Sequence, residues 1–419
     1  MTGLNLLYTD IETDLRASLR RLLADRCPPS AVAAVYEGAR SLATAVWKSL
    51  SHEMGLAGLL VPADRGGAGA SAREAAVTLE ELGRAVAPVP FLTSSVIATV
   101  TLLAAEAGSA ADELLAALAC GEAVAALAVP LTATEGDAQA LSSDAAGRVS
   151  GQVRSVAGAL GADAVLVLAD TPEGQSVVRV DSRDIDITPV TSLDMTRQLA
   201  DLTFVSAPGT TVVPGGHGRA AVDSALRAGT ALLASEQLGI AQWCLETSVG
   251  YVKDRRQFGR PIGSFQALKH RLADLFVLVE TAAGTARYAA AVLAEGDADL
   301  PVATSVGQAC CGDAAVRAAE EAIQFHGGMG MTWEHPLHLY LKRAKADQAA
   351  LGGSAYHRSR IAELADLPGT ASLTSSGTGT ADTLTVCGRR IGSNWTVTGG
   401  HGPVLAKLPL NLRECQPTQ

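Results

Sequence analysis

The sequence is poor in aromatic side chains and has no concentration of positive charge. Phe, Trp and Tyr make up 4% of the 419 residues, whereas 48% of the residues are hydrophobic. This balance favours a large helical core built from small side chains, and the length allows two or three domains. The formal net charge is -10 and no basic stripe is present, which argues against nucleic-acid binding.

Metal-binding cysteine patterns, a secretory leader and a long apolar run are also missing. The seven cysteines, which include the adjacent Cys310 and Cys311, match no zinc spacing and imply no disulfide framework. The amino terminus has no basic segment leading into an apolar run. The apolar stretch 116–130 is broken at Cys120-Gly121-Glu122 and is too short to span a bilayer. We therefore expect a cytoplasmic protein with reduced thiols, no metal site and no membrane span.

Apolar residues recur at helical spacing through most of the first 120 residues. The pattern predicts helices within 4–26, 46–60, 72–86 and 91–119. Ser71, followed three residues later by Glu74, predicts a capping box at the start of the third helix. Residues 1–120 are therefore interpreted as an amino-terminal helical domain.

The pattern changes twice in the rest of the chain. Residues 121–215 contain short apolar runs bounded by Gly, Asp and Pro, which predict a central β-sandwich or barrel. Four long helical patterns then cover 219–253, 264–293, 302–325 and 337–364, and they predict a carboxy-terminal four-helix bundle within 216–367. Residues 368–419 are rich in Thr, Ser, Gly and Pro. We expect a poorly ordered extension there, or the product of a reading-frame change.

Two turns within the predicted bundle carry residues suited to a ligand. Residues 324–330 read QFHGGMG, and their glycines leave the backbone open to another molecule. A helix follows, and helix starts receive anions. Residues 255–259 read RRQFG, and Arg255 offers a planar fork for phosphate oxygens. The alternatives are a ligand-free turn between helices and an arginine that complements the dipole at a helix end.

At this separation the two turns resemble those of the acyl-CoA dehydrogenase family, which carries an R-x-x-F-G turn and a Q-x-x-G-G-x-G turn in its carboxy-terminal helical domain. The resemblance covers most of residues 1–365, and includes the run MGLAGLLVPADRGGAGAS. It implies a mostly helical fold with a central β-domain, FAD as cofactor, and α,β-dehydrogenation of an acyl-CoA thioester in fatty-acid or sterol degradation. A carboxylate takes the Cα proton and flavin N5 takes hydride from Cβ.

The resemblance also implies which residues touch the cofactor. In the family, these bundle motifs hold the diphosphate and adenosine half of the FAD of a neighbouring subunit. The matching positions in this sequence are Arg255, Gln257, Phe258, Phe265, Gln266, Gln324, Gly327 and Gly328.

The positions that the family uses for its catalytic base hold no carboxylate in this chain. Leu351 stands where many members have a glutamate after the glycine-rich turn, and Gly229 stands where other members have it on the first bundle helix. Ser155 and Ala157 replace a tryptophan and a threonine that touch the flavin ring. The chain thus resembles the subunit of mixed α2β2 enzymes that lacks the glutamate and completes the FAD site of its partner.

Two other interpretations stay open. A self-sufficient homotetramer would need an unusual base, for which Glu236 is the first candidate, two helical turns after Gly229; Asp223 and Asp347 are weaker ones. The competing interpretations are a Glu236 paired inside the bundle and an Asp347 in a surface salt bridge. Alternatively, the chain is a catalytically silent structural or binding homologue.

Partners follow from the same resemblance. They are an acyl-CoA substrate, a related acyl-CoA dehydrogenase subunit in a homo- or hetero-tetramer, and an electron-transfer flavoprotein as electron acceptor. Small residues at 228–235 on the first bundle helix would make room for a bulky or branched acyl group.

Overall fold

The computed structural model describes residues 4–38, 41–367, 388–391, 394–399 and 402–406. Contacts divide the chain into two units, Met1–Arg358 and Ser359–Gln419, and each is considered by itself. Within the second unit, β10 (Gly388–Ile391), β11 (Asn394–Gly399) and β12 (Gly402–Ala406) pair antiparallel. The prediction of a poorly ordered extension falls largely on residues outside those described.

The first 120 residues form a helical layer around α4. The helices of this layer are α1 (Asp10–Arg26), α2 (Pro29–Ala34), α3 (Ser41–Lys48), α4 (Ala72–Ala85), the wider π-helical turn η5 (Phe91–Ala98), α5 (Thr99–Leu103) and α6 (Ala111–Cys120). The capping box predicted at the start of α4 is confirmed, because the Ser71 side chain accepts from the backbone while Glu74 reaches back to Ser71. The helix predicted over 91–119 is interrupted between α5 and α6.

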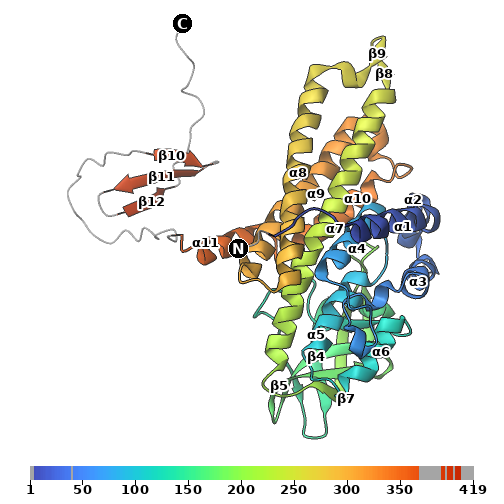
Figure 1. The fold of residues 1–419 in the computed structure, drawn as a ribbon, viewed down its shortest axis with the longest axis vertical. Coiled ribbons are helices and arrows are strands. Elements are labelled where there is room, and N and C mark those ends of the chain that lie inside the picture. Colours follow the sequence, from blue (N-terminus) through green and yellow to red (C-terminus); the bar gives the residue numbers. More distant parts are fainter. Residues whose placement is uncertain (1–3, 39–40, 368–387, 392–393, 400–401, 407–419) are drawn as a thin grey trace. The chain divides into compact units, whose positions relative to one another are not determined.

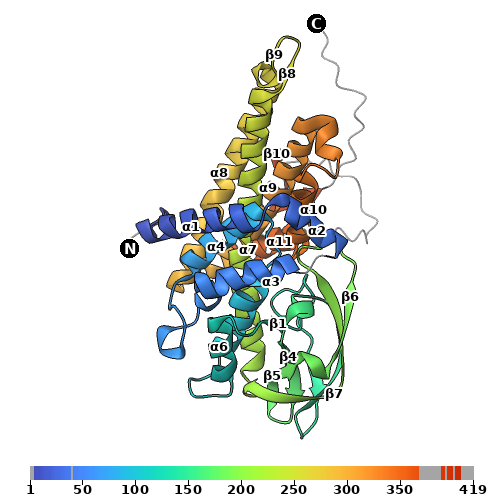
Figure 2. The same ribbon diagram turned by 90° about the vertical axis from the view of Figure 1, so that its right-hand side faces the viewer.

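A small closed barrel follows the helical layer. Its strands are β1 (Ala125–Leu127), β2 (Leu141–Ser143), β3 (Arg148–Ala157), β4 (Ala164–Thr171), β5 (Gly174–Asp181), β6 (Asp186–Val190) and β7 (Leu199–Val213). Strands β4, β5, β7, β3 and β2 pair in a ring that returns to β4, with β1 parallel to β4 and β6 on β7. The central β-domain predicted from short apolar runs is thus a barrel, and it lies beside the first half of the following helix (Figure 2).

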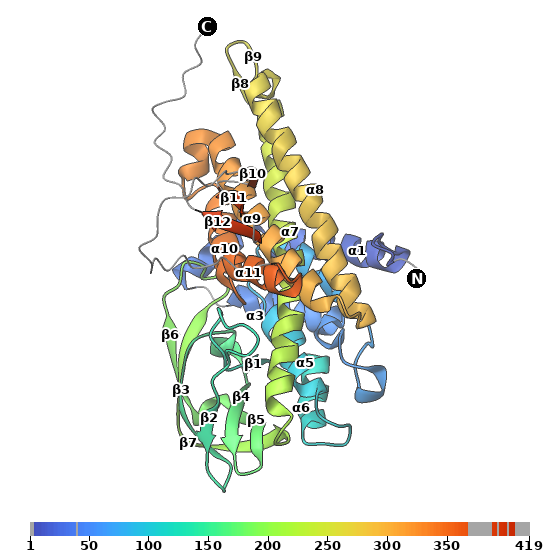
Figure 3. The same cartoon turned by 90° about the vertical axis from the view of Figure 1, so that its left-hand side faces the viewer.

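Long helices form the carboxy-terminal bundle. They are α7 (Gly218–Asp254), α8 (Gln266–Glu295), α9 (Leu300–His326), α10 (Leu337–Ala349) and α11 (Ser354–Leu364). Figures 1 and 3 show α7 and α8 side by side up to the hairpin of β8 (Arg256–Gln257) and β9 (Arg260–Pro261) that joins them. The last predicted helix, 337–364, is in fact two helices. Leu351 and Gly352 take left-handed backbone conformations, with φ 52° and 91°, and these break the helix.

Glycines let the helical layer approach the bundle closely. A Cβ on Gly239 of α7 would lie 1.9 Å from the Glu80 carbonyl oxygen of α4, and one on Gly83 would lie 2.1 Å from the Glu236 carbonyl oxygen. This contact places α4 directly on the middle of α7. The two helices therefore fix the position of Glu236, which belongs to the site described below.

One described helix, α8, has the length and hydropathy of a possible membrane span. Half of that apolar window is buried inside the protein, where α8 packs against α7 and α9. Helix packing in the bundle accounts for that half. The five cysteines of the described residues, Cys27, Cys120, Cys244, Cys310 and Cys311, are all unpaired.

Candidate functional site

The first predicted cofactor segment is the exposed hairpin between α7 and α8. Arg255 caps the carboxy-terminal end of α7, and among the described residues its guanidinium forms no ion pair. Gln257 lies in β8. Phe258, at the tip with φ 52°, leaves 90% of its surface exposed. Phe265 and Gln266 begin α8, and the Phe265 ring supports Phe258 edge-on at 6.1 Å.

The second predicted segment is the turn after α9. Gln324 is exposed in the last turn of that helix. Gly327 has φ 58° and ψ -134°, a conformation that glycine tolerates best, and a Cβ on Gly327 or Gly328 would meet nothing within 4 Å. Gly330 instead turns inward, because its Cβ would lie 2.6 Å from the Ile323 carbonyl oxygen. The turn thus exposes backbone on one side and is anchored on the other.

The structure brings the two segments together at their inner ends. The Tyr251 ring, in the last turn of α7, stacks on His326, the last residue of α9, with 4.2 Å between ring centroids. His326 in turn lies 4.6 Å from His335. An unpaired guanidinium beside an open glycine turn suits an anionic, elongated group, so these residues are compatible with the diphosphate half of FAD.

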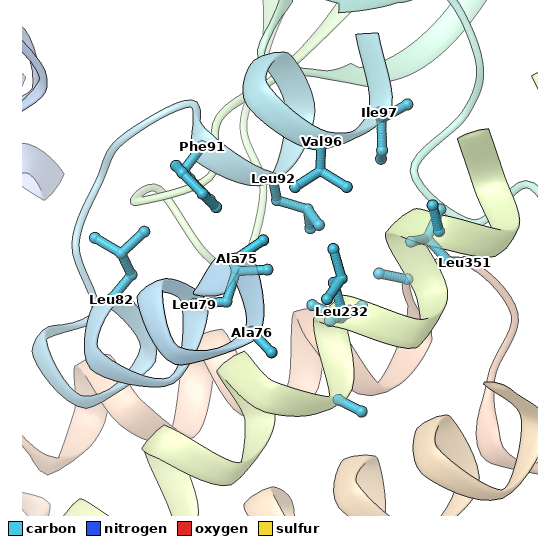
Figure 4. Packing of buried hydrophobic residues seen from close by; sticks show 14 of the residues in the cluster. Ala75, Ala76, Leu79, Leu82, Phe91, Leu92, Val96, Ile97, Leu232 and Leu351 are labelled. Carbon is cyan, nitrogen blue, oxygen red and sulfur yellow. The ribbon is translucent and has the colours of Figure 1, made fainter. Parts of the chain in front are cut away.

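The two base positions of the family lie next to each other in an apolar cluster. A Cβ on Gly229 would lie 2.8 Å from Ile97 Cγ1 and 3.4 Å from Leu351 Cδ1. Leu351 is 3% exposed. Figure 4 shows Ile97 and Leu351 in the same cluster as Leu232 of α7. No side chain larger than hydrogen is accommodated at position 229 without movement of Ile97, so a proton acceptor at either position would be surrounded by hydrocarbon.

Backbone hydrogen bonds join the base position to the strand that should face the flavin ring. The Leu351 N–H donates to the Leu131 carbonyl at 2.8 Å, and the Leu131 N–H donates to the Ser155 carbonyl at 3.0 Å. By the resemblance, an acyl chain and a flavin ring would be layered between positions 351 and 155. Stacked layers need about 3.5 Å each. Leu131 occupies the space between these two positions, so this chain's own residues do not fit a flavin ring there.

Glu236 belongs to a buried ion cluster, which consists of Asp194, Arg197, Glu236, Arg343 and Asp347. Arg197 donates to both Glu236 carboxylate oxygens, at 2.8 and 2.6 Å, and Arg343 also donates to one of them. Arg343 Nε lies 2.5 Å from Asp194, and Arg197 pairs with Asp347. Every side chain of the cluster is at most 9% exposed. Its members come from the loop before β7, from α7 and from α10.

The cluster contains three carboxylates and two guanidinium groups. Burial by itself raises the pKa of Glu236, but Arg197 and Arg343 outweigh it and hold that pKa below its usual range. Burial, with the nearby Glu236 charge adding to it against the opposing effect of Arg197, raises the pKa of Asp347 to about 8. A neutral Asp347 leaves two carboxylates against two guanidinium groups, so the buried charges balance.

Hydrogen bonding around Asp347 agrees with that proton. Gln237 and Gln308 both donate to the Asp347 backbone carbonyl, at 3.0 and 3.1 Å. Their side-chain oxygens and Asp347 Oδ2 are buried without a partner. A carboxylate cannot donate, whereas a carboxylic acid provides one O–H for an amide oxygen.

The structure changes the interpretation of the three candidate bases. Glu236 is 2% exposed and both its oxygens are held by arginine, so it is paired inside the bundle. The expectation of a surface salt bridge at Asp347 is wrong, because that residue is fully buried. Asp223 accepts from the Gly136 N–H at 2.9 Å and fastens the loop 134–138 to α7. The small residues 228–235 are all buried in helix packing and leave no acyl-binding space.

An apolar cavity of about 350 Å³ remains between the helical layer and the barrel. Trp47, Leu92 and Met195 contribute to its wall, and Arg197 reaches its edge from the buried ion cluster. No Asp or Glu lines it. The cavity can accept an apolar group but supplies no base.

A helical domain, a closed β-barrel and a four-helix bundle in this order define the three-domain class of flavoprotein dehydrogenases. Residues 9–122 match the family model described as acyl-CoA dehydrogenase, N-terminal domain, and residues 216–365 match acyl-CoA dehydrogenase, C-terminal domain. The chain belongs to the acyl-CoA dehydrogenase family.

Similar proteins cover nearly the whole of the three-domain unit. The acyl-CoA dehydrogenase IpdE2 of Mycobacterium tuberculosis is 35% identical over 331 residues, which are 79% of this chain and 89% of that protein. A chain of the ChsE4–ChsE5 complex of the same organism has 26% identity and a TM-score of 0.74, over 87% of this chain and all of that one. A chain of the Tcur3481–Tcur3483 steroid dehydrogenase has 27% identity and a TM-score of 0.75, over 85% and 98%.

Proposed function

We propose that this chain is the subunit of a mixed acyl-CoA dehydrogenase that lacks the catalytic glutamate. It completes the FAD site of a neighbouring chain that carries the glutamate, and it has no complete active site of its own. The observation that carries the proposal is the apolar packing of Gly229, Ile97 and Leu351 at the base positions, together with Leu131 in the space where a flavin ring would lie.

The residues directed toward the partner are exposed. Arg255 would bind diphosphate oxygens and Gln324 a polar edge of the cofactor, while Phe258 would exclude water from it. The FAD, when bound, supplies the hydride acceptor. The acyl-CoA and the base belong to the glutamate-bearing chain. Exposed Phe276 and Val277 on α8 provide an apolar surface on which that chain would pack.

Two kinds of support come from similar proteins. The solved neighbours ChsE4–ChsE5 and Tcur3481–Tcur3483 are complexes of two named chains, as a mixed enzyme would be. The second is called a steroid acyl-CoA dehydrogenase, which suggests a bulky acyl group as substrate of the complex. We further propose an electron-transfer flavoprotein as the acceptor of electrons from the bound FAD.

The test is flavin content with and without a partner. The chain is purified alone and after co-expression with a related glutamate-bearing chain, and flavin absorbance and its bleaching by acyl-CoA are recorded. We expect flavin and bleaching only in the co-purified complex, and a loss of flavin from the complex with Arg255→Ala. Flavin that bleaches in the lone chain would overturn the proposal and favour the self-sufficient homotetramer.

Restoring the family glutamate is not expected to restore catalysis. In Leu351→Glu the carboxylate would enter an apolar cluster beside Ile97, where burial raises its pKa and destabilises the fold by about 2–4 kcal/mol. Leu351→Met, of similar volume, serves as the control and should cost less than about 1.5 kcal/mol. Urea unfolding measures both variants. Acyl-CoA bleaching by the lone Leu351→Glu chain would show that its own site can still close around a flavin.

A further inference from the structure

Trp333 is a large aromatic ring held in place at the surface beside the glycine turn. It leaves 72% of its surface exposed, only five residues after Gly328. Lys342 Nζ lies 4.2 Å from its ring centroid and the same distance from that of Tyr36, so the ammonium group sits between the two rings. The His338 ring meets Trp333 at 4.7 Å and 65°.

These contacts restrain the indole without covering it. A ring that packs for stability is normally buried, whereas Trp333 has its supports on one side and solvent over most of its surface. The segment that carries it is also anchored: His335 lies 4.6 Å from His326, and the Thr332 hydroxyl donates to the Met329 carbonyl at 2.9 Å. The ring is therefore available to a flat group approaching from outside this chain.

We propose that Trp333 is a stacking platform for the adenine ring of the neighbouring subunit's FAD. This inference rests on the proposed function, which places the diphosphate and adenosine half of that cofactor at Arg255, Gln324 and the glycine turn. A fixed, exposed indole in the next few residues of the same segment matches the flat, uncharged face of an adenine. It stabilises the nucleotide half of the cofactor and makes no contact with the reacting flavin ring.

The experiment compares two flavins on the complex of this chain with its glutamate-bearing partner. The complex is stripped of flavin and titrated with FAD and with FMN, which lacks the adenosine half. Base stacking on an aromatic ring contributes about 1–3 kcal/mol. Trp333→Ala should therefore weaken FAD binding by roughly 5- to 100-fold and leave FMN binding unchanged, whereas Trp333→Phe should retain most of the FAD affinity.

Met331→Ala provides the matched control, because Met331 is 82% exposed two residues away and has no ring. It should leave both dissociation constants unchanged. Equal weakening of FAD and FMN by Trp333→Ala would mean that Trp333 only supports the turn, and an unchanged FAD affinity would mean that it touches no adenine; either result overturns the inference. If the wild-type complex binds no FAD at all, the proposed function fails first, and this inference falls with it.

Discussion

Replacing Arg343 with methionine is expected to lower the free energy of unfolding by about 3–5 kcal/mol, the range measured when one partner of a buried ion pair is removed. Arg343 is 2% exposed, and it pairs with Asp194 and Glu236 at the same time. Methionine fills much of the volume but leaves Asp194 with only the hydroxyls of Thr196 and Tyr36 for its charge. The measurement is urea unfolding of the purified chain at pH 7.

A lysine on the same helix supplies the control. Lys345 pairs with Glu320 at 2.9 Å, but the two side chains are 40% and 46% exposed. Exposed ion pairs contribute about 0–1 kcal/mol, so Lys345→Met should change the stability by no more than that. Similar small losses in both variants would show that the buried ion cluster is not needed to hold α10 and the loop before β7 against α7.

The destabilised Arg343→Met chain should also behave differently in acid. Without Arg343, Asp194 and Glu236 lose the charge that lowers their pKa values, so they take up protons at higher pH than in the wild type. The stability difference between the variant and the wild type should therefore shrink as the pH falls toward 5. A purely steric cost of methionine would not depend on pH.

The order of the domains could be predicted from the sequence because each part carries a regular signal. Long stretches of helical spacing mark α7, α8 and α9, and short apolar runs between Gly and Asp mark the strands of the barrel. The break between α10 and α11 was missed. Its signal was present in Gly352-Gly353, but helical spacing on both sides of the pair favoured one continuous helix.

The buried ion cluster could not be predicted, because its charges are distant in the sequence. Arg197 and Glu236 are 39 residues apart, and Arg343 and Glu236 are 107 apart. The neighbours of Asp347 in the sequence, Lys342 and Lys345, suggested an exposed charged helix. The fold instead turns Asp347 and Arg343 to the inner face of α10, and only the helix packing decides this.

The absence of a base, in contrast, was visible in the sequence. Leu351 and Gly229 could be aligned with the base positions of the family, since the motifs around them are preserved. What the structure adds is the arrangement of Leu131 and Ile97 around these positions. Backbone hydrogen bonds such as those from Leu351 to Leu131 and on to Ser155 carry no sequence signal, because any residue type can make them.

Asp347→Asn is expected to stabilise the protein above neutral pH and to remove much of the pH dependence of its stability. The folded-state pKa of Asp347 is raised to about 8 from an ordinary value of 3.8. Between these pH values the folded chain binds a proton that the unfolded chain does not, so the stability of the wild type falls as the pH rises from about 4 to 8 and then levels off. Each unit of difference corresponds to about 1.36 kcal/mol.

Asparagine reproduces the neutral acid without needing that proton. Its side-chain oxygen can still accept from Arg197, and its amide can donate to the unpaired oxygen of Gln237 or Gln308. The gain over the wild type in urea unfolding should grow by about 2–4 kcal/mol between pH 5 and pH 8. Asp25→Asn, at a side chain 77% exposed, should show no such growth. An Asp347→Asn chain less stable than the wild type at pH 8 would mean that Asp347 is ionised and serves as the counter-ion of Arg197, in which case the buried ion cluster would carry a net negative charge.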